Sequence, residues 1–175
     1  MKTEVLLLTV SLGAACALSG CASGPAGSNS SSRVSVVFVE PQRFTDLKID
    51  SRTGTDPELL DQLQYFMVTT GERFVPAGMR LEIKVSDVDM AGGFAVSLGQ
   101  EYAAVRAVVR ENPPRVKLEF SLTNDKGEIV KSGTRDISDA SFMSRNQPSN
   151  EGALSYEKNM LRNWFNDEFG KIRKS

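Results

Sequence analysis

Two segments in the middle of the chain alternate between apolar and polar residues, which restricts them to strands of a sheet with one buried face. The apolar positions are Met79, Leu81, Ile83 and Val85 in residues 79–86, and Val116, Leu118, Phe120 and Leu122 in residues 115–122. Residues 124–127 (NDKG) predict a hairpin turn with Gly127 in the left-handed conformation. Residues 128–137 are therefore expected to return as an antiparallel strand.

Two further segments predict strands of a different kind. Residues 34–39 are β-branched or aromatic and apolar on nearly both faces, which is typical of an interior strand covered on both sides. Residues 104–110 form a plausible strand that Pro113 and Pro114 end. The glycine-rich residues 91–100 between the strands are expected to form a loop.

Two helices complete the predicted fold. The first follows a cap at Thr55 or Asp56, has Pro57 in its first turn, and ends with Gly71 as a cap. The apolar positions recur at helical spacing, with Leu59, Leu60, Leu63, Phe66 and Met67 in the first helix and Tyr156, Met160, Leu161, Trp164, Phe165, Phe169 and Ile172 in the second. The order β-α-β-β-β-β-α predicts an α+β two-layer sandwich, a mostly antiparallel sheet of about five strands with two helices on one face.

The first twenty residues predict a secretory signal. One lysine precedes a run of apolar and small residues from 5 to 18, which is too short to span a membrane as a helix. Leu18-Ser19-Gly20-Cys21 follows and resembles a bacterial lipobox. By that resemblance Cys21 becomes the first mature residue and carries lipid, including palmitate. An ordinary secreted protein with a chance cysteine is the alternative.

The anchor has consequences for location and chemistry. In Gram-negative lipoproteins an aspartate after the cysteine favours the inner membrane, and Ala22 stands there instead. We therefore expect the periplasmic face of the outer membrane, with the lipid bilayer as a partner through Cys21. Residues 21–32 comprise the lipidated cysteine and a flexible linker rich in glycine and serine, and residues 33–175 a single α+β domain. Cys16 leaves with the signal, so no disulfide or cysteine nucleophile is expected in that domain.

Composition excludes several classes of function. Lysine and arginine total 21 against 22 acidic residues, which gives a formal charge of −1 and no field suited to nucleic acid. The chain lacks histidine, the commonest general base and metal ligand. The folded segment has no serine-nucleophile, Walker or dinucleotide-binding motif, and nothing predicts a cofactor. A non-catalytic protein is therefore the stronger expectation.

Paired aspartates are the main chemical candidates. In a continuous strand Asp87 and Asp89 share a face with Cα atoms about 6.6 Å apart, a spacing suited to acid catalysis. That continuation would bury both, so we expect the strand to end or bulge at residues 86–87 and the aspartates to lie in a loop. Asp46, from the loop after residue 41, is the third candidate. With Asp50 and Asp56 it could join the pair around a hard cation such as calcium.

A concave pocket that Asp87 and Asp89 line together with Asp46 or an aromatic wall would favour a carboxylate-based hydrolase or cation-binding module, and a convex, solvated loop would end that alternative. A second candidate is a basic surface formed by Arg106, Arg110, Arg115 and Lys117, which could meet lipid head groups or peptidoglycan carboxylates. Exposed cations are usually only solvated, so the simpler reading is an ordinary surface.

Several of these segments together resemble an uncharacterised family of small Gram-negative periplasmic proteins, a domain of unknown function whose members often carry a signal peptide or lipobox. The segments are residues 36–41 (VVFVEP), 44–46 (FTD), 81–83 (LEI), 87–92 (DVDMAG), 113–116 (PPRV) and the helix over 156–169. The resemblance covers Val34 to Phe169. It supports the limits and location of the domain and implies no activity or ligand.

The sequence thus favours an outer-membrane lipoprotein that acts as a non-catalytic binding or scaffolding module, with an envelope protein or peptidoglycan as partner. The alternative is the carboxylate-based hydrolase or cation-binding module centred on Asp87 and Asp89.

Overall fold

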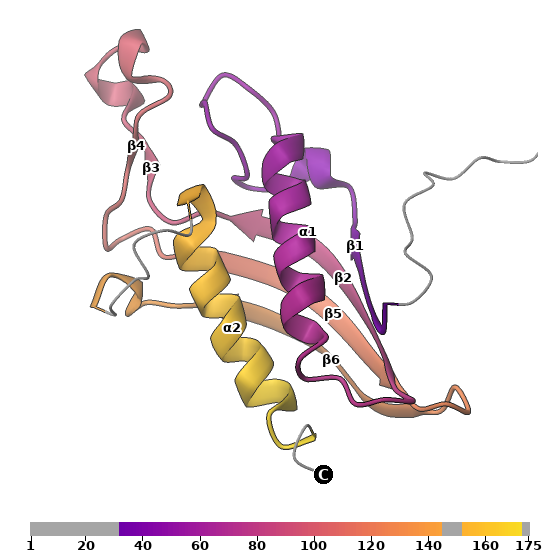
Figure 1. Ribbon diagram of the computed structural model, residues 1–175. Helices are drawn as coiled ribbons and strands as arrows, with labels where there is room; N and C mark the ends of the chain where they lie inside the picture. The colour runs from indigo at the N-terminus through magenta and orange to yellow at the C-terminus, as the bar shows by residue number, and fades with distance from the viewer. Residues whose placement is uncertain (1–31, 145–151, 173–175) are drawn as a thin grey trace, which may run out of the picture.

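A computed structural model describes residues 32–144 and 152–172. The fold is α+β, with a mixed four-stranded sheet, a small two-stranded sheet and two helices packed against the larger sheet (Figure 1). The elements are β1 (Val34–Phe38), α1 (Pro57–Gly71), β2 (Arg80–Asp89), β3 (Gly93–Phe94), β4 (Arg106–Ala107), β5 (Arg115–Thr123), β6 (Ile129–Ser138) and α2 (Ser155–Phe169). Short 3₁₀ turns in the described chain lie at Pro41–Arg43, Val96–Leu98, Gln100–Tyr102, Phe142–Ser144 and Gly152–Leu154.

The larger sheet has the strand order β1-β2-β5-β6. Strands β2, β5 and β6 pair antiparallel, as the alternation and the hairpin turn predicted, and Gly127 has a φ of 79° in that turn. Strand β1 instead lies parallel to β2, because the chain crosses over through α1 before β2 begins. The sheet is therefore mixed, with two of its three pairings antiparallel.

The prediction of an interior strand at residues 34–39 is wrong. Strand β1 is an edge strand, and its alternate side chains are buried and exposed. Val34 and Val36 face the core, whereas Val37 is 48% exposed on the other face and Val39, just beyond the strand, is 43% exposed. Valine at exposed strand positions reflects β propensity and not burial.

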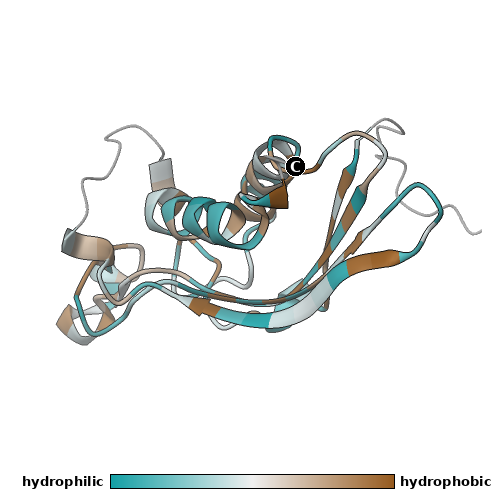
Figure 2. Cartoon of the chain, turned by 90° about the horizontal axis from the view of Figure 1, so that it is seen from below, coloured by the Kyte–Doolittle hydropathy of each residue, from teal (hydrophilic) through white to brown (hydrophobic). Residues whose placement is uncertain are grey.

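Both helices cover the same face of the larger sheet, which leaves the other face open (Figure 2). The core lies between these layers. Its fully buried side chains include Leu63 and Met67 from α1, Leu161 and Phe165 from α2, and Ile83, Val85 and Leu118 from the sheet. The two apolar stripes and the two alternating strands therefore meet as predicted.

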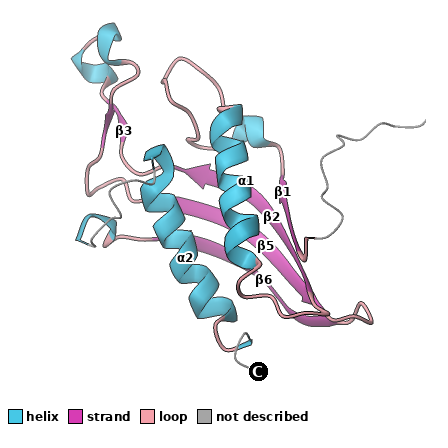
Figure 3. Cartoon of the chain, viewed as in Figure 1, coloured by secondary structure: helices cyan, strands magenta, loops and turns pink. Residues whose placement is uncertain are grey.

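Residues 93–107 form an arm that projects beyond the end of the larger sheet (Figures 1 and 3). In the arm β3 and β4 pair antiparallel, Gly93 with Ala107 and Phe94 with Arg106. The strand predicted at residues 104–110 is thus reduced to Arg106–Ala107 and lies outside the main sheet. Its residues lack the alternation that would bury one face, so only the short hairpin pairing forms.

Helix α1 begins as predicted and ends differently. The Asp56 carboxylate caps it by accepting hydrogen bonds from the backbone N–H groups of Glu58 and Leu59. Gly71 is the last helical residue and does not adopt the predicted left-handed cap conformation. The capping position is Glu72, which has right-handed helical angles. A Cβ at Gly71 would lie 3.1 Å from Val34 and 3.2 Å from Phe165, so this glycine permits close packing of α1 on β1 and α2. Within the described residues, no helix has the length and apolarity needed to cross a membrane.

Candidate functional site

A β-bulge in β2 decides where the candidate aspartates point. Val85 pairs with Leu118 and Asp87 pairs with the adjacent Lys117, so Ser86 is an extra residue on one strand. The phase of the alternation changes there, and Val88 becomes fully buried instead of the aspartates on either side of it. The predicted bulge at residues 86–87 is confirmed. The predicted loop is wrong, because β2 continues through the bulge to Asp89.

The loop after β1 brings Asp46 alongside Asp89. The backbone N–H of Asp46 donates to the carbonyl of Val88 at 2.9 Å, and the N–H of Met90 donates to the carbonyl of Asp46 at 3.0 Å. These bonds form an isolated parallel bridge between Asp46 and Asp89. Two candidates 43 residues apart in sequence therefore become neighbours, with Cα atoms at about the strand spacing of 4.8 Å.

Asp46 and Asp89 line an open polar hollow of about 740 Å³ at the end of the open sheet face, beside the base of the arm. The other charged residues that line it are Glu111, Arg115 and Asp136. The hollow also includes Gly92, where φ is 79° and a Cβ would lie 2.3 Å from the carbonyl oxygen of Ala107. A glycine is therefore required where the arm leaves the sheet.

Asp46 is fixed by Arg106. One guanidinium nitrogen of Arg106 lies 2.9 Å from each carboxylate oxygen of Asp46, and the two side chains are only 14% and 16% exposed. The same guanidinium stacks over the ring of Phe94 at 4.4 Å. This ion pair joins the base of the arm to the loop after β1, which is a structural role.

Asp87 lies outside the hollow and is also engaged. It accepts hydrogen bonds from the Thr45 backbone N–H at 2.8 Å and hydroxyl at 3.0 Å, and it pairs with Lys117 at 3.2 Å. Burial opposes ionisation, but the hydrogen bonds from Thr45 and Lys117 outweigh it and lower the pKa of Asp87. Asp87 therefore stays ionised and does not share a proton with Asp89.

Asp89 differs from its neighbours. Among the described residues its carboxylate makes no hydrogen bond and no ion pair. Burial, followed by the negative charges of Asp46 and Asp87, raises the pKa of Asp89, while Arg106 and Arg115 act in the opposite direction. A half-buried carboxyl group with a raised pKa in a polar hollow has the properties of a general acid.

The four cations of the predicted basic surface have separate environments. Arg106 binds Asp46, Arg115 makes a bidentate pair with Asp136, and Lys117 binds Asp87. Arg110 is exposed and makes no ion pair with the part of the chain that the structure describes. Three of the four charges are thus compensated by acids, and the set does not form a continuous positive patch.

The acids considered for a hard cation are also dispersed. Asp50 pairs with Arg52, whose hydrogen bonds lower the pKa of Asp50 to about 2, and Asp56 caps α1. Within residues 32–144 and 152–172, no three acidic, histidine or cysteine residues converge in a way that could hold a metal ion.

Sequence reasoning missed one buried acid near the hollow. Glu157 in α2 is 1% exposed and accepts a hydrogen bond from the backbone N–H of Ala91 at 2.7 Å. Its second carboxylate oxygen, Oε2, is buried and has no hydrogen-bond partner in the described chain. Burial raises the pKa of Glu157. This residue ties α2 to the turn between β2 and the arm.

Cys21, the predicted signal and the predicted linker up to residue 31 lie outside the described residues, whereas Ser32 is described and donates a hydrogen bond to Glu72. A family model described as "Protein of unknown function (DUF3016)" matches residues 32–167, which include the whole of both sheets, the hollow and most of α2. Searches of the curated proteins and of the solved structures found no match. No catalytic or metal site is evident in the described residues. The match spans well over half of the chain, and the protein therefore belongs to the DUF3016 family of proteins of unknown function.

Proposed function

We propose that this protein is a lipoprotein of the outer membrane that faces the periplasm, with a domain that acts as a non-catalytic binding or scaffolding module. The observation that carries the non-catalytic part is that Asp46 and Asp87 are neutralised by fixed internal partners. Carboxylates paired in this way stabilise the local structure, whereas acid–base catalysis needs carboxyl groups free to exchange protons. Leu18-Ser19-Gly20-Cys21 supports the lipid anchor.

The anchor is tested with the two cysteines of the chain as a matched pair. The full-length protein, Cys21→Ala and Cys16→Ala are expressed in a Gram-negative host with an alkyne-tagged palmitate, and the membranes are fractionated. We expect label and outer-membrane location in the wild type and Cys16→Ala, and loss of both in Cys21→Ala. Label on Cys21→Ala, or an unlabelled soluble wild type, would contradict the anchor.

The binding role is tested in the same host with a photo-crosslinking amino acid at exposed positions around the domain. A discrete cross-linked envelope protein, or cosedimentation of the purified full chain with peptidoglycan sacculi, is the expected result. If no cross-linked protein forms at any position and the chain does not cosediment with sacculi, the result counts against a binding module.

A carboxylate-based hydrolase is the second candidate, and the juxtaposition of Asp46 and Asp89 in the hollow favours it. In this mechanism Asp89 acts as the general acid, because its raised pKa keeps it protonated at higher pH than an ordinary aspartate. The test measures soluble fragments released from dye-labelled sacculi. Asp89→Asn should abolish release, and Asp87→Asn should retain it. No release by the wild type would remove this candidate.

A further inference from the structure

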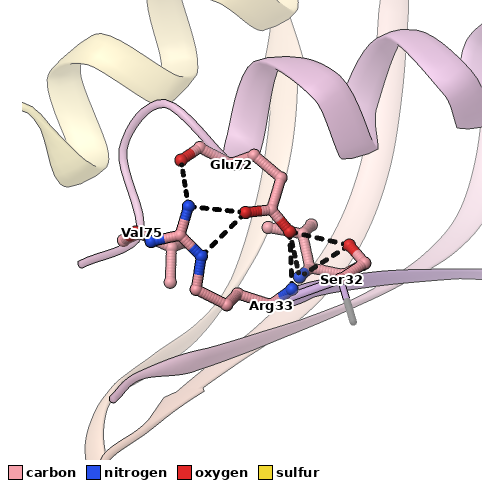
Figure 4. A network of polar contacts seen from close by, with 5 residues as sticks. Ser32, Arg33, Glu72 and Val75 are labelled. Atoms are coloured by element: carbon pink, nitrogen blue, oxygen red, sulfur yellow. Dashed lines mark hydrogen bonds and ion pairs between the residues drawn. The ribbon is translucent and has the colours of Figure 1, made fainter. Parts of the chain in front are cut away.

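The two edges of the larger sheet differ, and the edge on β1 is partly closed by hydrogen-bonding side chains, most of them around Glu72 at the start of the strand (Figure 4). On the outer edge of β1, the backbone N–H of Val34 donates to the Glu72 carboxylate at 3.2 Å, and its carbonyl accepts from the Ser32 hydroxyl at 2.8 Å. The carbonyl of Val36 accepts from the Gln64 side-chain amide at 3.1 Å. Edge groups that are already bonded do not attract another strand.

The opposite edge is formed by the ten-residue strand β6, and no further strand of the described chain pairs with it. The N–H of Asp139 donates to the carbonyl of Pro114, and the antiparallel register continues from that bond. Hydrogen-bonded pairs alternate in such a ladder, so the backbone groups of Ser132, Thr134 and Asp136 point away from β5. Among these outward groups in the described chain, only the Thr134 carbonyl has a partner, the Arg135 guanidinium at 2.9 Å.

A groove of about 400 Å³ runs between this edge and α2. Ile137 and Ser138 of β6 and Asp139 just after it line one side, and Met160, Asn163, Trp164 and Asp167 line it from α2. Met160 and Trp164 lie at the bottom of the groove with only 3% and 7% of their surface exposed, Ile137 is partly buried beside them, and the indole N–H of Trp164 has no acceptor in the described residues. A strand added to β6 would place every second side chain toward this groove.

The junction between β6 and α2, here called the seam, carries charged side chains that favour particular residues in such a strand. Lys131 and Arg135 project from β6 on the helix side and share one carboxylate, that of Glu168, at 2.7 and 2.8 Å. The two cations exceed the one shared anion at this end of the edge, whereas Asp139 and Asp167 place negative charge at the groove. A second copy of β6 would bring its own Lys131 and Arg135 to the same seam, where like charges repel.

We propose that β6 accepts an extended segment of a partner protein as an additional strand, with alternating apolar and acidic side chains directed toward α2. The backbone of the segment bonds to Ser132, Thr134 and Asp136. An apolar side chain enters the groove at Ile137 and Trp164, and acidic side chains meet Arg135 and Lys131. This mode of recognition takes affinity from main-chain bonds and specificity from alternate side chains. It rests on the proposed binding function and assigns the class of its partner.

The test uses Trp164, the only tryptophan in the chain, as a reporter. The full chain in detergent is titrated with the peptide Thr-Val-Thr-Glu-Thr-Ile-Thr-Glu-Thr and with a version that has lysine in place of glutamate. We expect a saturable change in Trp164 emission with the first peptide and at least about tenfold weaker binding of the second.

Two variants distinguish strand addition from nonspecific attraction. Thr134→Pro removes one outward N–H at a position where an edge strand tolerates proline. The affinity for the glutamate peptide should fall about tenfold. Thr134→Ala keeps that N–H and should bind within about twofold of the wild type. Circular dichroism checks that both variants fold.

Three results would overturn the proposal. They are equal binding of the two peptides, unchanged affinity in folded Thr134→Pro, and a dimer of the chain alone that Thr134→Pro dissociates in size-exclusion chromatography. Acylation of Cys21 and cross-linking in the envelope are read separately. If the peptide titration fails while the envelope cross-linking succeeds, β6 is excluded as the binding site and the proposed function is retained.

Discussion

Glu157 is the residue whose burial the sequence could have revealed. It precedes Leu161 by four positions and Trp164 by seven, so it lies on the apolar stripe of α2. Residue type alone favours the exposed side of the helix, because glutamate is rarely buried. The spacing was the better guide. An acid at a stripe position is a signal for a buried hydrogen bond, here with Ala91.

Glu157→Gln should change how stability depends on pH. Burial and the nearby Asp46 raise the pKa of folded Glu157, while the bond from Ala91 and the charge of Arg106 limit the rise. A folded pKa above the unfolded value of about 4.3 means that the wild type loses stability as pH increases through that interval. Glutamine does not titrate and can still accept from Ala91.

Urea unfolding of both proteins from pH 4 to pH 8 measures this difference. The wild type should become progressively less stable relative to Glu157→Gln as pH rises. A constant difference across the range would show that Glu157 titrates as it does in the unfolded chain.

Glu72 gives a second prediction at this scale. Glu72→Ala removes the acceptor of the Val34 and Arg33 N–H groups and should lower the free energy of unfolding by about 1–3 kcal/mol. Burial opposes its ionisation, but hydrogen bonds from Ser32 and Arg33 outweigh it and lower the pKa of Glu72. Its contribution is therefore full above about pH 4.3 and declines as pH falls.

Amide hydrogen exchange of residues 33–38 and urea unfolding at pH 7 and pH 3 measure the effect. Glu82→Ala is the control, because Glu82 is half exposed on the open face of β2 and should change stability by less than about 0.5 kcal/mol. Equal effects of the two variants would show that Glu72 does not secure β1.

At the scale of elements, the phase change in β2 could be predicted from the sequence, whereas the position of β1 at the edge of the sheet could not. The order of Val85, Asp87 and Val88 conflicts with a regular alternation, and a bulge resolves the conflict locally. The apolar run of β1 contains no information on how many strands flank it. That number depends on pairing with β2, more than forty residues away, and on the crossover through α1.

Deletion of Ser86 tests whether the bulge is a single extra residue. The shortened strand would keep Val85 and Val88 facing the core and restore a regular ladder with β5, so the protein should fold with a modest loss of stability. Deletion of Lys84 is the matched control. It moves Val85 to the open face and should cost at least about 1.5–3 kcal/mol.

Thermal unfolding followed by circular dichroism compares the two deletions. A Ser86 deletion as destabilising as the Lys84 deletion would mean that the bend at the bulge is itself required for the fold.

For the whole molecule, the candidate site shows why sequence reasoning succeeds only in part. Asp46 and Asp89 were both identified, and the parallel bridge that brings them together is a tertiary contact without a local pattern. The arm beside them was expected as a loop, and its projection beyond the sheet exposes Val96, Leu98 and Tyr102. No alternation or helical spacing in residues 91–100 indicates that projection.

The arm should be separable from the rest of the fold. Replacement of residues 95–105 by Asn-Gly would close β3 and β4 with a two-residue turn. The main loss is the burial of Ala103 and the bond from the Ser51 N–H to its carbonyl, so unfolding should remain cooperative with a loss of under about 2 kcal/mol. Calorimetry measures this. Loss of the cooperative transition would show that the arm is part of the folding unit.

If the chain is held at Cys21 as proposed, the network around Glu72 has a mechanical consequence. Tension from such a tether enters at Ser32, next to β1. A force along the axis of this strand shears its bonds to β2 together, and does not open them one after another. Arg33 transmits part of the force to the end of α1 through Glu72 and the Val75 carbonyl. The attachment point thus resists being peeled from the domain when a partner pulls on it.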